Sequence, residues 1–388
     1  MVFRRNLSLF IVIICILISF KNRRSRRLST TDNSSISINI SPFSIHPVSL
    51  SSKNFEMIDY GTISSPLEYD FYRDSCPKAQ QIVRQVVENL YQLRPDMAPS
   101  LLRLIFHDCF IQGCDASVLL DSSDQIVSEK ESPPNSSLRG FDFIELIKSK
   151  LEEVCPGVVS CADILVLAAR ESVAMAGGPY YPVYTGRRDS TTAFPEHATA
   201  ELPSPHDHLS ELLGAFGSRG FDEREAVSLL GAHSIGEIHC KFFENRLYNF
   251  AGTNEPDPSL DPGFLDLLRT RCKNTHSTFS SYGSGSLSST LSPPPSNASS
   301  TEEPGMPMNY DGSAFGTQYY QSLLQGKGIL YADQQLMASE ETENWVRAYA
   351  SDISLFRRDF ALAMIKLSDL QVLTAPMGQI RRNCSKVA

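Results

Sequence analysis

The hydrophobic residues of this chain repeat mainly at helical spacing. Behind Pro77, apolar positions recur so that they line one face of a helix; these positions are Ile82, Val83, Val86, Val87, Leu90 and Tyr91. The same period predicts helices over 98–110, 141–154, 161–175, 209–216, 222–232, 237–249, 319–324, 342–350 and 353–367. Strand-like alternation is scarce, so the predicted fold class is mainly α.

Two signals mark the ends of one predicted helix. Ser160, followed three residues later by Asp163, resembles a capping box. Gly177 and Gly178, with a proline next, form a stop signal. We therefore expect the helix over 161–175 to begin after Ser160 and to end before Gly177.

Two stretches lack the helical pattern. Residues 28–65 are rich in Ser, Ile and Thr and are predicted to be a flexible leader before a folded domain at 66–388. Within that domain, residues from about 275 to 305 are mainly Ser, Pro, Thr and Gly, which bury too little apolar surface to offset their ordering entropy. This insertion is predicted to be a mobile surface loop. Asn33 and Asn297 match the glycosylation pattern in these stretches, with an unmodified linker as an equal alternative for each.

The N-terminus is predicted to direct export. Two arginines precede an apolar run over residues 7–20, which has the length of a signal core and is short for a bilayer span. No small-residue cleavage site follows, so residues 1–27 are interpreted as a signal peptide or a signal anchor, with membrane contact only if the segment stays uncleaved. An anchor with this basic flank would keep the rest of the chain cytosolic. Paired cysteines argue against that orientation, so secretion is preferred.

Composition and charge exclude other classes of protein. The 388 residues are 41% hydrophobic and 20% charged, enough apolar material for a large core. The formal charge is −9, and residues 1–27 hold seven cations and no acid, so the rest of the chain carries −16. Such an acidic body repels polyanions, and nucleic-acid binding is not expected.

The cysteine count favours disulfides. Besides Cys15, eight cysteines spread over the folded domain: Cys76, Cys109, Cys114, Cys155, Cys161, Cys240, Cys272 and Cys384. Structural zinc sites usually space paired ligands at C-x₂₋₄-C, and no such knuckle repeats here. Four disulfides in an oxidising compartment are therefore predicted, although spacing alone leaves the pairing open.

The segment 101–117 carries the strongest signs of chemistry. If it is helical to about Cys109, Arg103, Phe106 and His107 share one face. A cation, an aromatic wall and an imidazole around one pocket suit proton transfer beside developing negative charge. Taken singly, a histidine on an apolar helix is more often a core residue whose ring nitrogens have hydrogen-bond partners.

Hard oxygen ligands follow directly. Asp108, Asp115 and Ser117 offer side-chain oxygens, and the turn between them offers the carbonyls of Ile111 and Gly113. This mixture suits Ca²⁺ and not a transition metal. The order of residues is not that of an EF-hand.

A second histidine, His233, lies among small residues that let a flat ligand approach the backbone. Far downstream, Asp333 supplies a carboxylate of the kind that accepts the second N–H of a metal-bound imidazole. Spacing alone does not pair these two residues.

With these segments the chain resembles the secreted plant haem peroxidases of class III, from about Tyr69 to Lys386 apart from the Ser/Pro insertion. Besides the Arg-x-x-Phe-His-Asp-Cys run, the resemblance rests on Ser128-Glu-Lys130, Leu138-Arg-Gly-Phe141, Val159-Ser-Cys-Ala-Asp-Ile164, Gly186-Arg-Arg-Asp189, Leu202-Pro-Ser-Pro205, Gly231-Ala-His-Ser, Arg246-Leu-Tyr-Asn-Phe250, Asp333-Gln-Gln and Gln379-Ile-Arg-Arg-Asn-Cys384. Each motif alone is weak, but together and in this order they are highly specific.

The resemblance implies the haem-peroxidase helical fold, with haem b between a distal and a proximal half. It implies that His107 is the distal general base, that Arg103 stabilises charge on the departing peroxide oxygen, and that Asn135 keeps one nitrogen of His107 available. Phe106 is implied as a wall of the haem pocket. His233 is implied as the proximal iron ligand, with Asp333 strengthening it as a donor.

The resemblance also implies ligands, substrates and covalent links. The distal calcium set is Asp108, Ile111, Gly113, Asp115 and Ser117, with Glu129 in the outer shell. Pro203 resembles the residue that contacts the donor. The implied disulfides are Cys76–Cys155, Cys109–Cys114, Cys161–Cys384 and Cys240–Cys272.

Four positions depart from the family pattern. Ser234 keeps a hydroxyl for a proximal calcium, but Gly316 has lost the expected carboxylate and 309–311 reads Asn-Tyr-Asp, so an ordinary proximal calcium is not predicted. Tyr181 stands where the family commonly has Trp, and His206 follows the Pro-Ser-Pro turn. Asn135 also matches the glycosylation pattern, but a glycan there would clash with its distal role.

The predicted function is therefore a secreted, monomeric haem peroxidase that reduces hydrogen peroxide and oxidises small phenolic donors in one-electron steps. An alternative is a catalytically weak haem protein that binds at the cell wall or surface. A third interpretation, an intracellular peroxidase without disulfides, is disfavoured by the eight cysteines. The presence of Arg103, His107, Asn135, His233 and Asp333 together favours the enzyme.

Overall fold

Helices form nearly all the regular structure in the computed structural model, which describes residues 67–272, 305–308 and 314–388. The helices are α2 (Ala79–Leu93), α3 (Met97–Cys109), α4 (Phe141–Val154), α5 (Cys161–Met175), α6 (Pro195–Glu201), α7 (Leu209–Ser218), α8 (Glu223–Leu230), α9 (Glu244–Tyr248), α10 (Pro262–Cys272), α11 (Gln318–Leu324), α12 (Tyr331–Gln334), α13 (Glu340–Ser351) and α14 (Ile353–Ser368). Two short strands, β1 (Glu237–His239) and β2 (Gly305–Pro307), pair antiparallel. The predicted mainly α class is confirmed.

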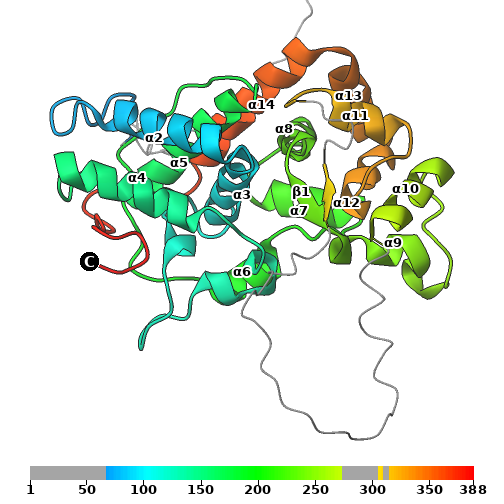
Figure 1. The fold of residues 1–388 in the computed structure, drawn as a ribbon, viewed down its shortest axis with the longest axis horizontal. Helices are drawn as coiled ribbons and strands as arrows, with labels where there is room; N and C mark the ends of the chain where they lie inside the picture. The colour runs from blue at the N-terminus through cyan, green and yellow to red at the C-terminus, as the bar shows by residue number, and fades with distance from the viewer. Residues whose placement is uncertain (1–66, 273–304, 309–313) are drawn as a thin grey trace, which may run out of the picture. The chain divides into compact units, whose positions relative to one another are not determined.

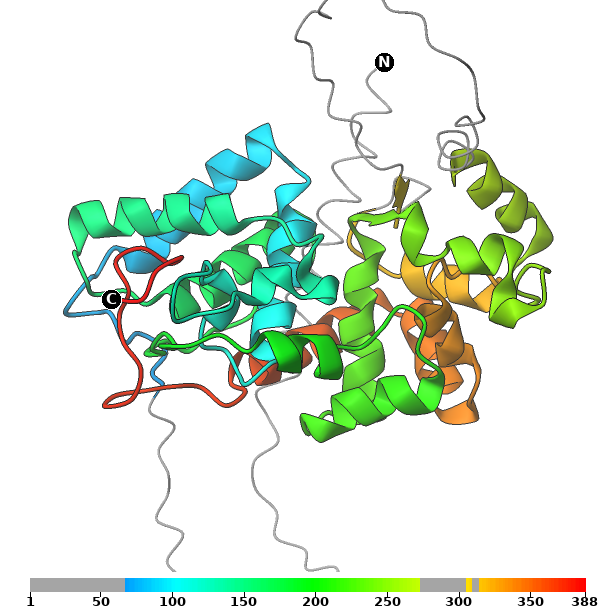
Figure 2. The ribbon, with the colours of Figure 1, turned by 90° about the horizontal axis from the view of Figure 1, so that it is seen from below.

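These helices form two halves of the described domain. Helices α2, α3, α4 and α5 pack on one another in the first half, whereas α8, α11, α13 and their neighbours form the second (Figure 1). Helix α14 contacts both α3 and α8 and so joins the halves (Figure 2). We call the half that contains α3 the distal half and the half that contains α8 the proximal half.

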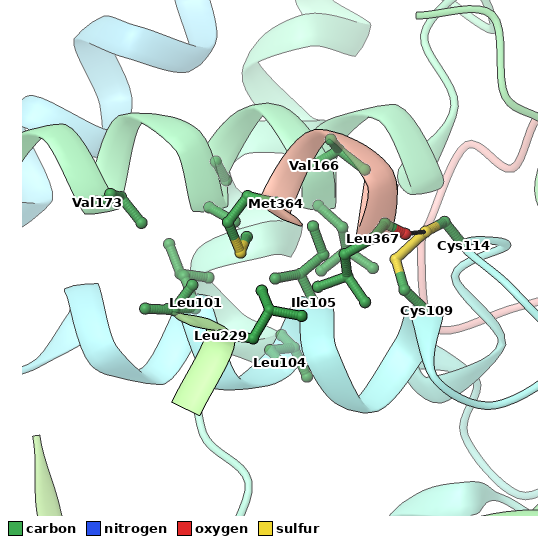
Figure 3. Close-up of a cluster of buried hydrophobic side chains, with 14 of the residues drawn as sticks. Leu101, Leu104, Ile105, Cys109, Cys114, Val166, Val173, Leu229, Met364 and Leu367 are labelled. Atoms are coloured by element: carbon green, nitrogen blue, oxygen red, sulfur yellow. Dashed lines mark hydrogen bonds between the residues drawn. A yellow bond between two sulfur atoms is a disulfide. The ribbon is translucent and has the colours of Figure 1, made fainter. Parts of the chain in front are cut away.

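A continuous apolar core runs through this junction. Leu101, Leu104 and Ile105 of α3 meet Val166 of α5 and Met364 of α14 (Figure 3), and each is at most 1% exposed. Shortening one of these large side chains to alanine would lower the free energy of unfolding by about 2–5 kcal/mol. The face of α3 opposite this core is left for polar side chains.

Four disulfides join the described residues: Cys76–Cys155, Cys109–Cys114, Cys161–Cys384 and Cys240–Cys272. The structure thus has four disulfides as predicted, in the pairing that the family resemblance implies. Cys161–Cys384 spans 223 residues and holds the C-terminal tail on the distal half. A link that closes so long a loop restricts the unfolded chain strongly.

Motif residues far apart in sequence meet in a buried polar network beside α5. Asp163 accepts hydrogen bonds from Tyr72 Oη at 2.6 Å and from Arg187 Nη1 at 2.9 Å. Both charged groups of this pair are fully buried. The hydroxyl of Ser160 caps α5 by accepting from the backbone N–H of Asp163. The reciprocal half of the predicted capping box is missing, because Asp163 is engaged by Tyr72 and Arg187 instead.

The predicted helix over 237–249 is wrong in its first half. Residues Glu237–His239 form β1, with Ile238 opposite Met306 of β2. Cys240–Phe242 is a 3₁₀ turn, and the α-helix covers only Glu244–Tyr248. Met306 is buried in a second apolar cluster with Phe243 and Leu247, so pairing of β1 with β2 serves this local core. The sequence pattern also left out α6, α10 and α12.

Within the described residues no helix is long and apolar enough to cross a membrane. The apolar run 7–20, the leader 28–65, the glycosylation patterns at Asn33 and Asn297, and nearly all of the Ser/Pro insertion lie outside the described residues. The corresponding predictions stay predictions.

Candidate active site

One face of α3 presents its polar side chains to a short segment that follows it in the chain. His107 Nδ1 lies 2.7 Å from Asn135 Oδ1, and the Asn135 amide group donates to the carbonyl of Glu129 at 2.9 Å. Arg103, one helical turn before His107, donates to the carbonyl of Pro134 and to the hydroxyl of Ser137, both at 3.0 Å. Residues 134–137 therefore hold both polar side chains of the α3 face.

The bond to Asn135 fixes the state of His107. Because the amide nitrogen of Asn135 is the donor to Glu129, its oxygen accepts from Nδ1–H, and the neutral ring then has a lone pair on Nε2. Burial, followed by the charge of Arg103, lowers the pKa of His107 to about 3, although the hydrogen bond to Asn135 acts in the opposite direction. No described residue hydrogen-bonds to Nε2. His107 is thus a neutral imidazole with a free acceptor at ordinary pH.

Arg103 is surrounded by protein and also reaches solvent. Burial lowers its pKa to about 10, whereas its side chain is exposed. Phe106, half-buried and 4.7 Å from the ring of Phe110 between centroids, belongs to the same face of α3.

His233 belongs to the proximal half. It lies in a 3₁₀ turn, Gly231–Ser234, that follows α8, and its Nδ1 is 2.9 Å from Asp333 Oδ1. Burial is the largest influence and lowers its pKa, but the charge and hydrogen bond of Asp333 outweigh it, so the pKa of His233 is raised. The charge of Arg103 lowers the pKa of both His107 and His233, so both imidazoles lie within electrostatic reach of this guanidinium.

Small residues make the 3₁₀ turn possible. A Cβ on Gly231 would lie 2.3 Å from Tyr320 Oη and 2.5 Å from a ring carbon of Phe356, so no larger residue fits there without a shift. Asp333 itself is 1% exposed and also accepts from Tyr319 Oη at 2.9 Å. Tyr319 was not assigned a role from the sequence. The role of Tyr319 is visible only in the structure, because this residue of α11 donates to Asp333 of α12, fourteen positions later in the chain.

The loop after α3 brings the predicted calcium ligands together. Asp108 accepts from the backbone of Ala116 at 3.0 Å, and Asp115 accepts from the backbone of Ser117 at 2.9 Å. The loop turns through Gly113, whose φ is +100° and whose added Cβ would lie 2.5 Å from the carbonyl oxygen of Gln371. Glycine is therefore required at this position.

Three buried carboxylates, those of Asp108, Asp115 and Glu129, lie in or beside this loop. Burial raises the pKa of Asp108, and the neighbouring charge of Asp115 raises it further. Burial also raises the pKa of Asp115 to about 6 and that of Glu129 to about 7. Ser117 Oγ and Glu129 Oε2 are buried and have no hydrogen-bond partner among the described residues. These features fit a bound hard cation.

The calcium set is not built from side chains alone. Among the described residues, no group of three or more His, Cys, Asp or Glu side chains is arranged to hold a metal ion. Calcium in this loop would need backbone carbonyls and a hydroxyl, as the predicted set of Asp108, Ile111, Gly113, Asp115 and Ser117 supplies.

Glu129 links the loop 108–117 to the distal histidine, His107. The carbonyl of Glu129 accepts from Asn135, whereas its carboxylate accepts from the backbone of Phe194 at 2.9 Å and lies beside Ser117. The backbone of Glu129 thus positions Asn135, which in turn is bonded to His107. Phe194 was not assigned a role from the sequence.

Comparison with known proteins decides the family. The peroxidase family model matches residues 83–352. The chain is 53% identical to "Putative Peroxidase 48" of Arabidopsis thaliana over 338 residues, which cover 83% of each protein. It is 39% identical to Peroxidase 57 and 42% identical to Peroxidase 22 of the same plant, over 82% and 84% of this chain and 92% and 87% of those proteins.

The chain is a class III haem peroxidase. Peroxidases of this family contain haem and calcium, react with hydrogen peroxide and a donor, and are typically secreted. The enzyme assignment made from the sequence is therefore confirmed.

Of the residues considered for a second calcium on the proximal side, the structure describes Ser234 and Gly316. Ser234 Oγ is buried without a hydrogen-bond partner among the described residues. Gly316 has no carboxylate to offer, and Asn309 and Asp311 lie outside the described residues. A hydroxyl alone is a poor calcium site, so the absence of an ordinary proximal calcium stays a prediction.

The segment with Pro203 lies between the two halves of the peroxidase. Pro203 is half-buried in the turn after α6, and the carbonyl of Pro205 accepts from the backbone of Ala332 at 3.1 Å. Ala332 precedes Asp333, so this turn is tied to the proximal carboxylate. His206 is exposed. Tyr181, in the place of the usual Trp, is buried with its hydroxyl unpartnered among the described residues.

Proposed function

We propose that this peroxidase reduces hydrogen peroxide with His107, Arg103 and Asn135 and oxidises small phenolic donors. The observation that carries the proposal is a pair of buried histidines whose pKa values are shifted in opposite directions, His107 bonded to Asn135 and His233 bonded to Asp333. A neutral distal imidazole with a free Nε2 suits a proton acceptor. A proximal imidazole bonded to a buried carboxylate suits a metal ligand.

The residues present fit a haem group. His233 would hold the iron through Nε2, because Nδ1 is committed to Asp333. The negative charge of Asp333 increases electron donation by the imidazole. Haem b, when bound, supplies the redox chemistry by accepting two oxidising equivalents from peroxide and returning them one at a time to donors.

His107 moves the proton on the distal side. Nε2 would accept a proton from one oxygen of hydrogen peroxide and give it to the other oxygen, which leaves as water. Asn135 keeps Nδ1–H as the hydrogen-bond donor, so the accepting nitrogen always faces the substrate. Arg103 stabilises the negative charge that develops on the leaving oxygen, and its position near Pro134 and Ser137 keeps it on the same face of α3.

Calcium in the loop 108–117 is proposed to support this arrangement. The cation would neutralise Asp108 and Asp115 and engage Ser117, while Glu129 remains in the outer shell. Because Glu129 also fixes Asn135, bound calcium would hold the distal imidazole in its working orientation.

Small phenols are the proposed donors, and Pro203 is the proposed contact residue. The turn 202–208 contributes the half-buried prolines Pro203 and Pro205 and the exposed His206, which suits an aromatic ring with a polar substituent. Secretion and a monomeric state are proposed with this function. A binding protein without turnover is not favoured, since no residue of the distal or proximal set is lost.

The test uses the purified chain with its disulfides formed and haem incorporated. Hydrogen peroxide is added with and without a small phenol, and the haem absorption band and phenol oxidation are followed. We expect a rapid spectral change with peroxide alone and recovery as the phenol is consumed. A chain that binds haem but shows neither change would refute the proposed activity.

A further inference from the structure

A line of oxidisable aromatic side chains runs from the proximal histidine to the surface of the proximal half. The ring of Tyr319 lies 6.2 Å from that of His233 between centroids, and Tyr319 lies 4.9 Å from Tyr320. Tyr320 lies 5.2 Å from Tyr349, and Tyr349 stacks on Trp345 at 5.9 Å with an interplanar angle of 29°. These separations are those of rings in or near van der Waals contact.

The members of this line come from separate elements. Tyr319 and Tyr320 belong to α11, and Tyr349 and Trp345 belong to α13, one turn apart on the same face. Helices α11 and α13 pack against each other (Figure 1). The three tyrosines are buried, whereas Trp345 is half-buried and reaches solvent. The line of rings is thus buried along its three tyrosines and reaches solvent at Trp345.

We propose that Tyr319, Tyr320, Tyr349 and Trp345 form an electron relay, and that Trp345 is a surface site at which the enzyme oxidises donors too large to enter the haem pocket. The proposal rests on the proposed function, because His233 must hold the haem that peroxide oxidises. The donors are phenols carried on polymers or on proteins.

Proton acceptors are in place at the two tyrosines where they are needed. Tyr319 donates its hydroxyl hydrogen to Asp333 at 2.9 Å, and Tyr349 donates to Asp359 at 2.9 Å. A tyrosine that loses an electron must also lose its phenolic proton, and a hydrogen-bonded carboxylate can accept that proton and return it. Tyr320 donates to backbone carbonyls alone, that of Val227 at 3.0 Å and that of Ser228 at 3.4 Å, so it serves as a bridge between the two.

The electrostatic surroundings of Trp345 define how it would react. The guanidinium of Arg224 lies over the indole, 4.5 Å from the ring centroid, and is paired with Asp359 at 2.9 Å. A cation in this position disfavours a positively charged indole radical. Oxidised Trp345 would therefore release its N–H proton to solvent and persist as a neutral radical.

The electrons and protons of this reaction balance with hydrogen peroxide as the oxidant. Trp345 gives one electron through the relay and one proton to solvent. A phenol then gives one electron and one proton to the indole, which restores Trp345 and leaves a phenoxyl radical. Two such cycles consume one hydrogen peroxide and yield two phenoxyl radicals and two waters.

The first experiment locates the radical. Haem-loaded enzyme receives one equivalent of hydrogen peroxide without donor, in the presence of a nitroso spin trap, and the adduct is mapped by peptide mass spectrometry. Trp345 is the only tryptophan of the chain, so an adduct on indole is unambiguous. We expect the adduct on Trp345, and we expect Tyr349→Phe to reduce its yield several-fold. Tyr184→Phe, at an exposed tyrosine of the distal half, should leave the yield unchanged.

The second experiment separates large from small donors. Trp345→Phe should slow oxidation of a phenol coupled to high-molecular-weight dextran several-fold and leave oxidation of the free phenol unchanged. The relay is refuted if enzyme that oxidises the free phenol normally shows no Trp345 adduct, if Tyr349→Phe leaves the adduct yield intact, or if Trp345→Phe affects both phenols equally. Loss of free-phenol oxidation in the unmodified enzyme would instead refute the proposed function.

Discussion

His107 and His233 are the same side chain with opposite pKa directions, and the difference lies in their partners. On the distal side a neutral amide, Asn135, accepts from Nδ1, and burial together with Arg103 lowers the pKa of His107 to about 3. On the proximal side a carboxylate, Asp333, occupies the equivalent position, and the pKa of His233 is raised. Both partner bonds are short, at 2.7 and 2.9 Å.

This comparison shows that the hydrogen-bond partner of Nδ1 decides the chemical role of a histidine side chain. An amide fixes the tautomer without adding charge, which keeps the ring a neutral base that gives its proton up easily. A carboxylate fixes the same tautomer and adds electron density, which makes the ring a stronger and permanent donor. Exchanging the partners should therefore exchange the properties, and the predictions below test each side.

The largest effect is expected from His107→Ala. Loss of a positioned proton acceptor should slow the reaction with hydrogen peroxide by roughly 10²–10⁴-fold or more. Haem retention should not change, because His233 is untouched. The measurement is the stopped-flow rate of the haem spectral change with peroxide. His206→Ala, which removes an exposed imidazole of the Pro203 turn, is the matched control, and a near-normal rate in the His107 variant would discard its role as proton carrier.

Asp333→Asn should change the properties of the proximal histidine, His233. Removing the charge behind His233 should lower haem affinity or turnover by about 10–100-fold. In the fraction that retains haem, the iron reduction potential should rise, because the imidazole donates less electron density. Tyr319→Phe removes one hydrogen bond to the same carboxylate and keeps its charge, so it should have a smaller effect. Equal effects in both variants would show that charge is not the deciding factor.

Asn135→Asp would place a carboxylate behind the distal histidine as well. In the native enzyme the peroxide rate should stay level as the pH falls and decline only near the His107 pKa of about 3. A carboxylate partner stabilises the protonated ring and raises that pKa, so the decline should begin at higher pH in the variant. Rate–pH profiles of both proteins measure this shift. Profiles that coincide would mean that the partner does not set the pKa.

Removal of calcium should give the smallest effect, and one that depends on pH. In the calcium-free chain Asp115 and Glu129 have pKa values of about 6 and about 7, above the ordinary 3.8 and 4.5. The folded chain then binds more protons than the unfolded chain, so its free energy of unfolding falls as the pH rises through this window. Calcium favours the ionised carboxylates, so the loss of thermal stability on adding a chelator should be greater at pH 8 than at pH 5. A loss independent of pH would contradict the assignment of the ligands.

Much of the fold and of the candidate site could be predicted from the sequence. The physical reason differs from one element to the next. Helices α4 and α5 begin and end as predicted, since an amphipathic face and a Ser160 cap are local properties. The segment 237–249 was mispredicted because β1 depends on a partner more than sixty residues away. Tyr319 and Phe194 were missed for the same reason. Their roles arise from contacts with Asp333 and Glu129 that no local pattern encodes.

The segment around Arg381 has a consequence for the distal site. Arg381 donates to the carbonyl of Ala116 at 2.7 Å, and the carbonyl of Ser385 accepts from the backbone of Asp121. The loop beside the distal histidine is therefore braced by residues that lie more than 260 positions further along the chain. Proteolytic loss of residues 381–385 would take these contacts away, so damage far along the sequence would act on the loop next to His107.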